Sequence, residues 1–217
     1  LEGTKEDFFE IGKKFGEAIS STKAKKIVLG RDTRPSGKII REGILAGISN
    51  AQIFDLGVVS TPCVAFMTKE LGADLGIVLT ASHNPESFNG IKVFEKNGQK
   101  LSELHEKELE QKLQNIDKNY EKNQNYGKKQ SKNIKITKIT PQKYISHILN
   151  HSKKLKDFEV AIDVSGGASE KLAKAVFEKL GARVHIIGKS KNHKINDGCG
   201  CLHLEHLKQY MKDYGVP

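Results

Sequence analysis

The first 80 residues alternate between short apolar runs and longer segments whose apolar residues recur every three or four positions. Short apolar runs bounded by turn residues are typical of buried strands, and the longer spacing is typical of amphipathic helices. We expect strands at 26–30, 52–56 and 75–79, and helices at 6–19, around Ile40, Ile44 and Ile48, and from Thr61 onward. Strands that are joined by helices through short loops favour an α/β domain built in layers.

The pattern continues after a polar interruption. A strand at 91–94 and a charged helix at 101–116 are followed by a segment rich in lysine and asparagine. The elements expected beyond it are a helix from about 141, strands at 160–164 and 183–187 with a helix between them, and a last helix near 204–214. We therefore expect a first domain at 1–117, a basic polar linker or variable segment at 118–138, and an incomplete second domain at 139–217.

The net charge of +10 is concentrated in one place. Residues 118–138 hold seven lysines and one acid, Glu121, so this stretch accounts for +6 of the total. A nucleic-acid partner would favour basic charge spread over a folded face, with aromatic side chains among it. Because the sequence shows no such pattern, we expect no nucleic-acid binding.

Composition also bears on location. Hydrophobic residues make up 37% of the chain and charged residues 29%, which is typical of a globular protein. No apolar run approaches the length of a bilayer span, and the first residues lack the basic-then-apolar layout of a secretion signal. Three cysteines in 217 residues do not form a disulfide framework. We expect a cytoplasmic protein with no membrane association.

Residues 80–85, Thr-Ala-Ser-His-Asn-Pro, follow the apolar run 75–79 directly. A strand that ends in such a turn presents the hydroxyl of Ser82 at a fixed place, because Pro85 fixes its own φ and pushes Asn84 toward an extended conformation. The alternative is an ordinary polar exit from a strand. For an isolated Ser-His-Asn that alternative would be the favoured interpretation.

Together with residues 89–92, Asn-Gly-Ile-Lys, this block resembles the active-site serine loop of the α-D-phosphohexomutases, the phosphoglucomutase and phosphomannomutase superfamily. The resemblance implies layered α/β/α domains with mixed sheets. It also implies that Ser82 is the nucleophile that carries a phosphoryl group between two hydroxyls of a phosphosugar, through a bisphosphate intermediate. A phosphate oxygen on Ser82 would be one ligand of Mg²⁺, and a sugar bisphosphate would act as activator.

The same resemblance implies roles for neighbouring residues. Lys92 would assist proton transfer; the alternative is a solvent-facing strand lysine. His83 would polarise or position the phosphoserine, or hold the loop in place. Asn84 would bind phosphate or bond its own loop backbone.

Residues 30–34, Gly-Arg-Asp-Thr-Arg, also match an early loop of the family. Here Arg31 would neutralise phosphate charge while Asp32 holds it in a bidentate pair. The alternative is an Arg–Asp pair that only locks the loop behind the site.

Residues 195–200, Ile-Asn-Asp-Gly-Cys-Gly, and His203 resemble a block of one branch, the phosphoglucosamine mutases. That branch interconverts glucosamine 6-phosphate and glucosamine 1-phosphate for cell-wall precursor synthesis. The alternative activities are phosphomannomutase and phosphoglucomutase. The same stretch contains four soft ligands within eight residues, Cys199, Cys201, His203 and His206, which is a possible zinc pattern, although Cys-x-Cys is tighter than the usual spacing.

The resemblance covers the first half of a four-domain enzyme. The aspartate-rich metal loop and the substrate-binding loops of the family would follow Pro217, so we expect partner domains from the same protein. The competing hypothesis is a short, non-catalytic relic, which a reading frame that stops at Pro217 would favour. For the isolated chain we expect no mutase turnover. The sequence contains neither the nucleotide-binding Gly patterns nor the Gly-x-Ser-x-Gly of serine hydrolases.

Overall fold

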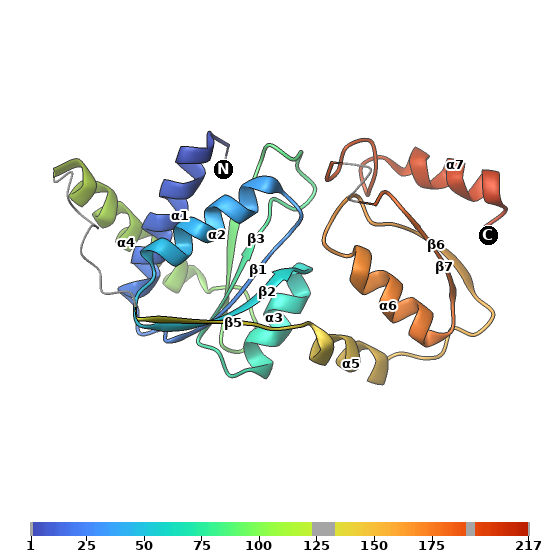
Figure 1. Cartoon of the computed structure of the whole chain (residues 1–217), viewed down its shortest axis with the longest axis horizontal. Helices are drawn as coiled ribbons and strands as arrows, with labels where there is room; N and C mark the ends of the chain where they lie inside the picture. The colour runs from blue at the N-terminus through green and yellow to red at the C-terminus, as the bar shows by residue number, and fades with distance from the viewer. Residues whose placement is uncertain (1, 123–132, 190–193, 217) are drawn as a thin grey trace.

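The computed structural model describes residues 2–122, 133–189 and 194–216. It contains two sheets, which belong to two units that follow each other along the chain (Figure 1). The first unit is built around five strands: β1 (Lys26–Arg31), β2 (Ala51–Val58), β3 (Leu75–Leu79), β4 (Ile91–Glu95) and β5 (Ile134–Lys138). Its helices are α1 (Lys5–Ser20), α2 (Pro35–Gly47), α3 (Thr61–Glu70) and α4 (Glu103–Lys122).

The first sheet has the strand order β4-β3-β1-β2-β5. Strand β1 pairs in parallel with both β2 and β3, β5 pairs in parallel with β2, and β4 runs antiparallel to β3. The sheet is therefore mixed, as expected. Because β1, β2 and β3 are parallel, their carboxyl ends meet at one edge of the sheet, where the loops that follow them come together.

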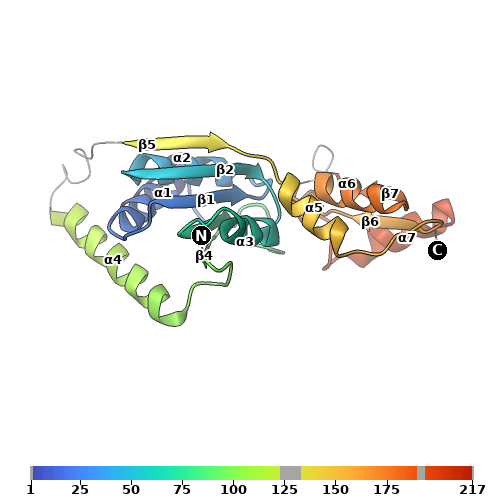
Figure 2. The same ribbon diagram turned by 90° about the horizontal axis from the view of Figure 1, so that it is seen from below.

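Helices cover both faces of this sheet, so the central strand is buried on both sides. Ile27 and Leu29 of β1 pack with α1 and α2 on one face, while Val28 packs with α3 on the other. The two apolar clusters form the α/β/α layers: in Figure 1, α1 and α2 lie above the strands and α3 lies below them, and Figure 2 shows the strands of the sheet side by side from the α3 face. A strand buried on both faces explains the uninterrupted apolar run in the sequence.

Helices α1 and α2 cross unusually closely because glycines line both sides of the contact. A Cβ atom on Gly12 would overlap the backbone oxygen of Ile40, and one on Gly43 would overlap that of Phe9. The capping box at the start of α1 also follows from the sequence: Thr4 accepts a hydrogen bond from the Asp7 backbone, and Asp7 accepts one from the Thr4 backbone.

The segment that we expected to be a polar linker contains parts of the first unit. Residues 118–122 form the last turns of α4, and β5 lies on the edge of the first sheet beside β2. In β5, Ile134 and Ile136 alternate with lysine and threonine, and lysine is a common protection of an exposed sheet edge. The basic charge of residues 118–138 led to the prediction of a linker, so this short alternating pattern was not identified as a strand. The domain limits at 117/118 and 138/139 stay predictions, and residues 123–132 lie outside the described part.

The second unit is smaller. It contains α5 (Gln142–Asn150), β6 (Glu159–Asp163), α6 (Glu170–Leu180), β7 (Arg183–Ile187) and α7 (Leu204–Tyr214), with β6 and β7 paired in parallel. These are the helices and strands that the sequence predicts for this part of the chain. Side chains of α5 contact the first unit: the ring of Phe66 in α3 lies 5.4 Å from that of Tyr144 and 4.6 Å from that of His147, between centroids.

None of the helices in the described ranges is both long enough and apolar enough to span a membrane.

Candidate active site

Ser82 lies in a loop, residues 80–90, that connects the carboxyl end of β3 to the start of β4. We call this the serine loop. Its two ends are tied together, because the Thr80 amide donates to the Gly90 carbonyl over 2.9 Å. Its position at the sheet edge follows from the register: Leu79, the last residue of β3, is paired with Arg31 at the end of β1. The loop therefore begins where the parallel strands end, at the usual place of an α/β active site.

The backbone of Ser82 is held in a left-handed conformation, with φ at 55°. This region is unfavourable for a residue with a side chain, by on the order of 1 kcal/mol. A local hydrogen bond from the Ser82 amide to Thr80 Oγ1, 3.0 Å long, supports the turn. The side chain of Ser82 is exposed, so its hydroxyl is accessible to a ligand. The requirement that a carrier serine be reachable is met.

Lys92 contacts Ser82 directly. Its Nζ donates a hydrogen bond to Ser82 Oγ over 2.7 Å. Lys92 is the second residue of β4 and is paired with Val78, one residue before β3 ends. The antiparallel return of the chain thus brings a residue ten positions later back beside the hydroxyl. Both side chains are exposed, so the pair lies on the surface and not in the core.

Arg34 fixes the serine loop from inside the protein. Its side chain is completely buried, and its guanidinium donates to three backbone carbonyls of the loop. Nη2 bonds the carbonyl oxygen of Ser82 at 3.0 Å and that of Asn84 at 2.8 Å, and Nη1 bonds that of Pro85. A guanidinium presents several donors in a rigid plane, which suits this task.

Asp32 compensates the buried charge. Its Oδ2 accepts a hydrogen bond from Arg34 Nε at 3.0 Å, and its Oδ1 accepts one from the Arg34 backbone amide. The predicted pair between the side chains of Asp32 and Arg31 is wrong: the side chain of Arg31 instead donates to the backbone carbonyl oxygen of Asp32 over 2.9 Å. The Asp-x-Arg spacing was available in the sequence but gave no reason to prefer the second arginine. An Arg–Asp pair behind the site, the alternative left open, is present with Arg34.

The structure places the other candidate residues at the same sheet edge, and within the described part of the chain none of them forms a hydrogen bond with the Ser82 hydroxyl. Arg31 is half-buried at the end of β1, and His83 and Asn84 are exposed in the serine loop. The ring of His83 forms no hydrogen bond with the described residues. Asn84 contributes its backbone: its amide donates to the Ala81 carbonyl, and its own carbonyl oxygen accepts from Arg34. Their proposed contacts with phosphate stay predictions.

A residue of the 195–200 block, to which the sequence assigned no role in the site, reaches the serine loop from the second unit. The Nδ2 atom of Asn196 lies 2.8 Å from the carbonyl oxygens of both Ser82 and Asn84. A further contact between the units joins Thr33 Oγ1 to the Gly166 carbonyl over 2.6 Å. The 195–200 block was singled out in the sequence, but its contact with the serine loop could not be predicted, because Asn196 is separated from Ser82 by 114 positions in the chain.

The cysteine and histidine cluster does not converge on one point. In the described ranges, no group of three or more histidine, cysteine, aspartate or glutamate side chains is placed to hold a metal ion. Cys199 is buried while Cys201 is exposed. Burial raises the pKa of the Cys199 thiol, and the nearby charge of Asp163 raises it further. This environment favours the neutral thiol over the thiolate that binds zinc.

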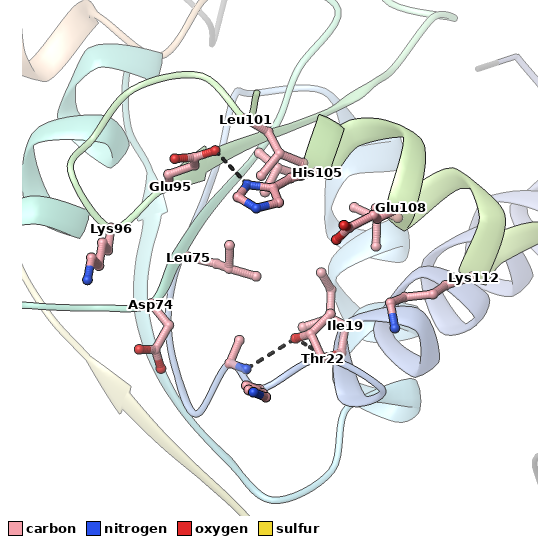
Figure 3. Close-up of a pocket in the computed structure, with 14 residues that line it drawn as sticks. Ile19, Thr22, Asp74, Leu75, Glu95, Lys96, Leu101, His105, Glu108 and Lys112 are labelled. Atoms are coloured by element: carbon pink, nitrogen blue, oxygen red, sulfur yellow. Dashed lines mark hydrogen bonds and ion pairs between the residues drawn. The ribbon is translucent and has the colours of Figure 1, made fainter. Parts of the chain in front are cut away.

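A cavity of about 360 Å³ lies at the opposite end of the first sheet (Figure 3). Its lining includes Leu75, the first residue of β3, and Glu95, the last residue of β4. Helix α4 closes one side, where His105 Nδ1 and Glu95 Oε1 are 2.9 Å apart. Because Ser82 follows the other end of β3, this cavity is separate from the serine loop.

Sequence comparison identifies the class of protein to which this fold and loop belong. Residues 2–120 match the family model described as phosphoglucomutase/phosphomannomutase, alpha/beta/alpha domain I. This match covers more than half of the chain, so the chain belongs to the phosphoglucomutase/phosphomannomutase family. The resemblance found in the serine loop is thereby confirmed.

Curated relatives narrow the relationship. The chain is 39% identical over 196 residues to the phosphoglucosamine mutase of Campylobacter fetus subsp. fetus, which covers 86% of this chain and 43% of the relative. It is 37% identical over 223 residues to the phosphoglucosamine mutase of Clostridium tetani, which covers 98% of this chain and 48% of the relative. The chain spans less than half the length of these relatives.

Solved structures agree on the fold. A putative phosphomannomutase from Thermus thermophilus superposes with a TM-score of 0.65 at 20% sequence identity, over 85% of this chain and 42% of that one. A phosphoglucomutase/phosphomannomutase family protein from Burkholderia thailandensis gives 0.62 at 22% identity, over 88% and 43%. The expected fold class is therefore confirmed.

Proposed function

We propose that this chain is the phosphoryl-carrying part of a phosphosugar mutase, an isomerase, with Ser82 as the carrier. The observation that carries this proposal is the Ser82 hydroxyl itself: it is exposed at the carboxyl edge of the sheet and hydrogen-bonded to Lys92 Nζ at 2.7 Å. Its loop is held by a fully buried arginine. Phosphoryl transfer depends mainly on positioning and on neutralising charge, and these contacts supply both.

The proposed reaction uses two transfers. A hydroxyl oxygen of the sugar phosphate attacks the phosphorus on Ser82, a new P–O bond forms, and the bond from phosphorus to Ser82 Oγ breaks. A sugar bisphosphate results, and after it turns round, Ser82 Oγ takes the other phosphoryl group. In the first transfer one proton leaves the sugar hydroxyl and one reaches Ser82 Oγ. Lys92 Nζ, which is hydrogen-bonded to Ser82 Oγ, would deliver that proton. In the second transfer Ser82 Oγ would return the proton to Lys92 Nζ as it takes the phosphoryl group, and the departing sugar oxygen would gain one proton.

Charged and polar neighbours would bind the phosphate. Lys92, as a cation, would neutralise part of the charge on phosphorylated Ser82, and Arg31 at the end of β1 would contribute a second positive charge. His83 and Asn84 are exposed beside Ser82, where they can contact a phosphate or a sugar hydroxyl. These assignments rest on position in the serine loop and at the sheet edge.

Mg²⁺ is the metal that the family relationship suggests, and a hard cation of this kind takes oxygen ligands. Among the described residues, no group of three or more acidic or histidine side chains converges near Ser82. A phosphate oxygen on Ser82 would supply one ligand, and a complete set is not formed by the described part of the chain. The further ligands would come from elsewhere in the protein, as would a binding site for a sugar bisphosphate activator.

The preferred substrate of the complete protein is proposed to be glucosamine phosphate, interconverted between its 6-phosphate and 1-phosphate forms. The curated relatives named phosphoglucosamine mutase support this choice. This assignment would place the activity in cell-wall precursor synthesis. Glucose and mannose phosphates are the alternatives to be compared.

The test measures turnover of the complete protein on glucosamine 1-phosphate, glucose 1-phosphate and mannose 1-phosphate, with Mg²⁺ and a sugar bisphosphate. We expect the highest kcat/KM with glucosamine 1-phosphate and no measurable turnover by the 217-residue chain alone. Ser82→Ala should lower the rate below detection while the unfolding temperature stays unchanged, because the exposed hydroxyl adds little to the core.

Ser87→Ala is the matched control, since Ser87 is an exposed serine of the same loop. It should keep the wild-type rate. Mass spectrometry should find one phosphate on the peptide that contains Ser82 in the wild type and none in Ser82→Ala. A Ser82→Ala protein that still converts the substrate would remove Ser82 from the carrier role.

A further inference from the structure

We infer that Asn196 is a positioning residue through which the second unit holds the serine loop, so that the placement of Ser82 depends on both units. This inference rests on the proposed role of Ser82. Within the described part of the chain, the side chain of Asn196 bonds neither the Ser82 hydroxyl nor Lys92. It acts on the backbone beneath the hydroxyl.

The geometry is a closed set of four hydrogen bonds. Arg34 Nη2 donates to the carbonyl oxygens of Ser82, at 3.0 Å, and Asn84, at 2.8 Å. Asn196 Nδ2 donates to the same two oxygens, each at 2.8 Å. Two donors from different units thus share one pair of acceptors in the serine loop.

The hydrogen-bond donors and acceptors in this set match in number. An Nη2 group and an Nδ2 group each carry two hydrogens, and a carbonyl oxygen has two lone pairs. All four hydrogens and all four lone pairs are therefore used. Removing Asn196 leaves each carbonyl with one bond to Arg34 and frees the loop on the side that faces the second unit.

Asn196 is held in place by its own unit. Its backbone is in the left-handed region, with φ at 61°, and its amide donates to the Ser165 carbonyl over 2.9 Å. The preceding residue, Ile195, is buried. The carboxylate of Asp163, at the end of β6, accepts from the amides of Ser165 at 2.8 Å and Gly200 at 2.7 Å. One carboxylate, whose side chain is 7% exposed, therefore fixes both turns that present Asn196.

This arrangement gives the serine loop two kinds of support. Arg34 belongs to the first unit and holds the loop from within, whereas Asn196 holds it from outside. A displacement of a reacting group by about 1 Å can lower a rate by about 100-fold. Loss of Asn196 should therefore affect the transfer step more than the binding of substrate.

The test compares Asn196→Asp, Asn196→Ala and Thr33→Val in the complete protein. Asn196→Asp keeps the size of the side chain but sets an acceptor against two carbonyl oxygens, so we expect kcat to fall by about 100-fold, with KM within about twofold. Asn196→Ala removes the donors without repulsion, and we expect a fall of about tenfold. Thr33→Val is the matched control, because it removes a different hydrogen bond between the units without touching the serine loop. Its kcat should stay close to that of the wild type.

Amide hydrogen exchange supplies a readout that does not need activity. The amides of Ser82 and Asn84 are bonded within the loop, to Thr80 Oγ1 and the Ala81 carbonyl. They should exchange faster in both Asn196 variants than in the wild type and in Thr33→Val, at an unchanged unfolding temperature.

Equal losses in Thr33→Val and Asn196→Asp would overturn the inference, since they would indicate general docking of the units and no specific hold on the loop. Unchanged kcat and exchange in Asn196→Asp would overturn it as well. If the wild type converts no phosphosugar, the proposed function fails, and the exchange comparison still decides whether Asn196 holds the loop.

Discussion

The two sheets of the molecule differ in how completely they are covered. In the first sheet, β1 is buried on both faces, and side chains such as Ile27, Val28 and Leu29 have almost no exposed surface. In the second, no residue of β6 is fully buried, and neither α5 nor α7 contains a buried residue in the described part. Large apolar side chains such as Phe158, 60% exposed, and Tyr214, 67% exposed, lie at its surface.

This difference explains why the first sheet can hold the side chains of the candidate site in fixed positions. A fully covered sheet has a fixed edge, so the loops at that edge can hold a serine and a lysine within 2.7 Å. The second unit adds a few directed hydrogen bonds at that edge and little shared core. The three predictions that follow test this contrast, starting with the largest effect.

The buried Arg34–Asp32 pair of the first unit should be the costliest contact to break. Arg34→Leu leaves Asp32 as an unpaired charge with an almost completely buried side chain, and we expect a loss of about 3–5 kcal/mol in the free energy of unfolding. Chemical denaturation of the complete protein measures it. The double variant Arg34→Leu/Asp32→Asn removes the stranded charge and should regain most of the stability, but not the activity. A single variant as stable as the double one would show that the charge is not desolvated.

Core truncations should separate the two units. Ile44→Ala in α2 removes a side chain with no exposed surface from the larger cluster, and we expect a loss of about 4 kcal/mol. Leu180→Ala in α6 removes a side chain that is 6% exposed in the thinner unit, where the surroundings can relax more easily, and we expect about 2 kcal/mol. Thermal unfolding followed at several probes tests this order. The reverse order would show that the second unit is the more tightly packed.

Each unit also has a carboxylate–histidine pair near its surface, His105 with Glu95 and His185 with Glu159, and breaking either pair should have the smallest effect on stability. The hydrogen bond from His105 lowers the pKa of Glu95, and the hydrogen bond to Glu95 raises the pKa of His105 above its usual 6.5. In the second unit, the hydrogen bond from His185 lowers the pKa of Glu159. NMR titration of the histidine ring and glutamate side-chain signals measures these shifts.

The sign of the pH dependence follows from these directions. The contribution of His105 is complete below pH 6.5 and is lost as pH rises through the raised pKa. The contributions of Glu95 and Glu159 are present above pH 4.5 and are lost as pH falls through their lowered pKa values. Glu95→Gln should return the His105 titration to its usual range. An unshifted His105 in the wild type would contradict the pairing that ties α4 to β4.

Much of the fold could be predicted from the sequence because its signals are local. Apolar runs and helical spacing predicted the strands and helices of both units, and the serine loop was identified by its resemblance to the active-site loop of the α-D-phosphohexomutases. The edge strand β5 was missed, since its two isoleucines are set among lysines and the basic charge of the surrounding segment favoured a linker. Lys92 was proposed from the family resemblance of its block, and its contact with Ser82 is seen only in the folded chain.

The sequence by itself thus determined the order of the elements, the buried periodicity and the chemistry offered at the sheet edge. Tertiary structure alone decided which arginine pairs with Asp32, and that Asn196, 114 positions away, supports the serine loop. The physical reason is that a hydrogen-bond partner is chosen by where two backbones meet in space. Residue spacing constrains that meeting within a turn or hairpin, but not between units whose contacting residues are more than 100 positions apart in the chain.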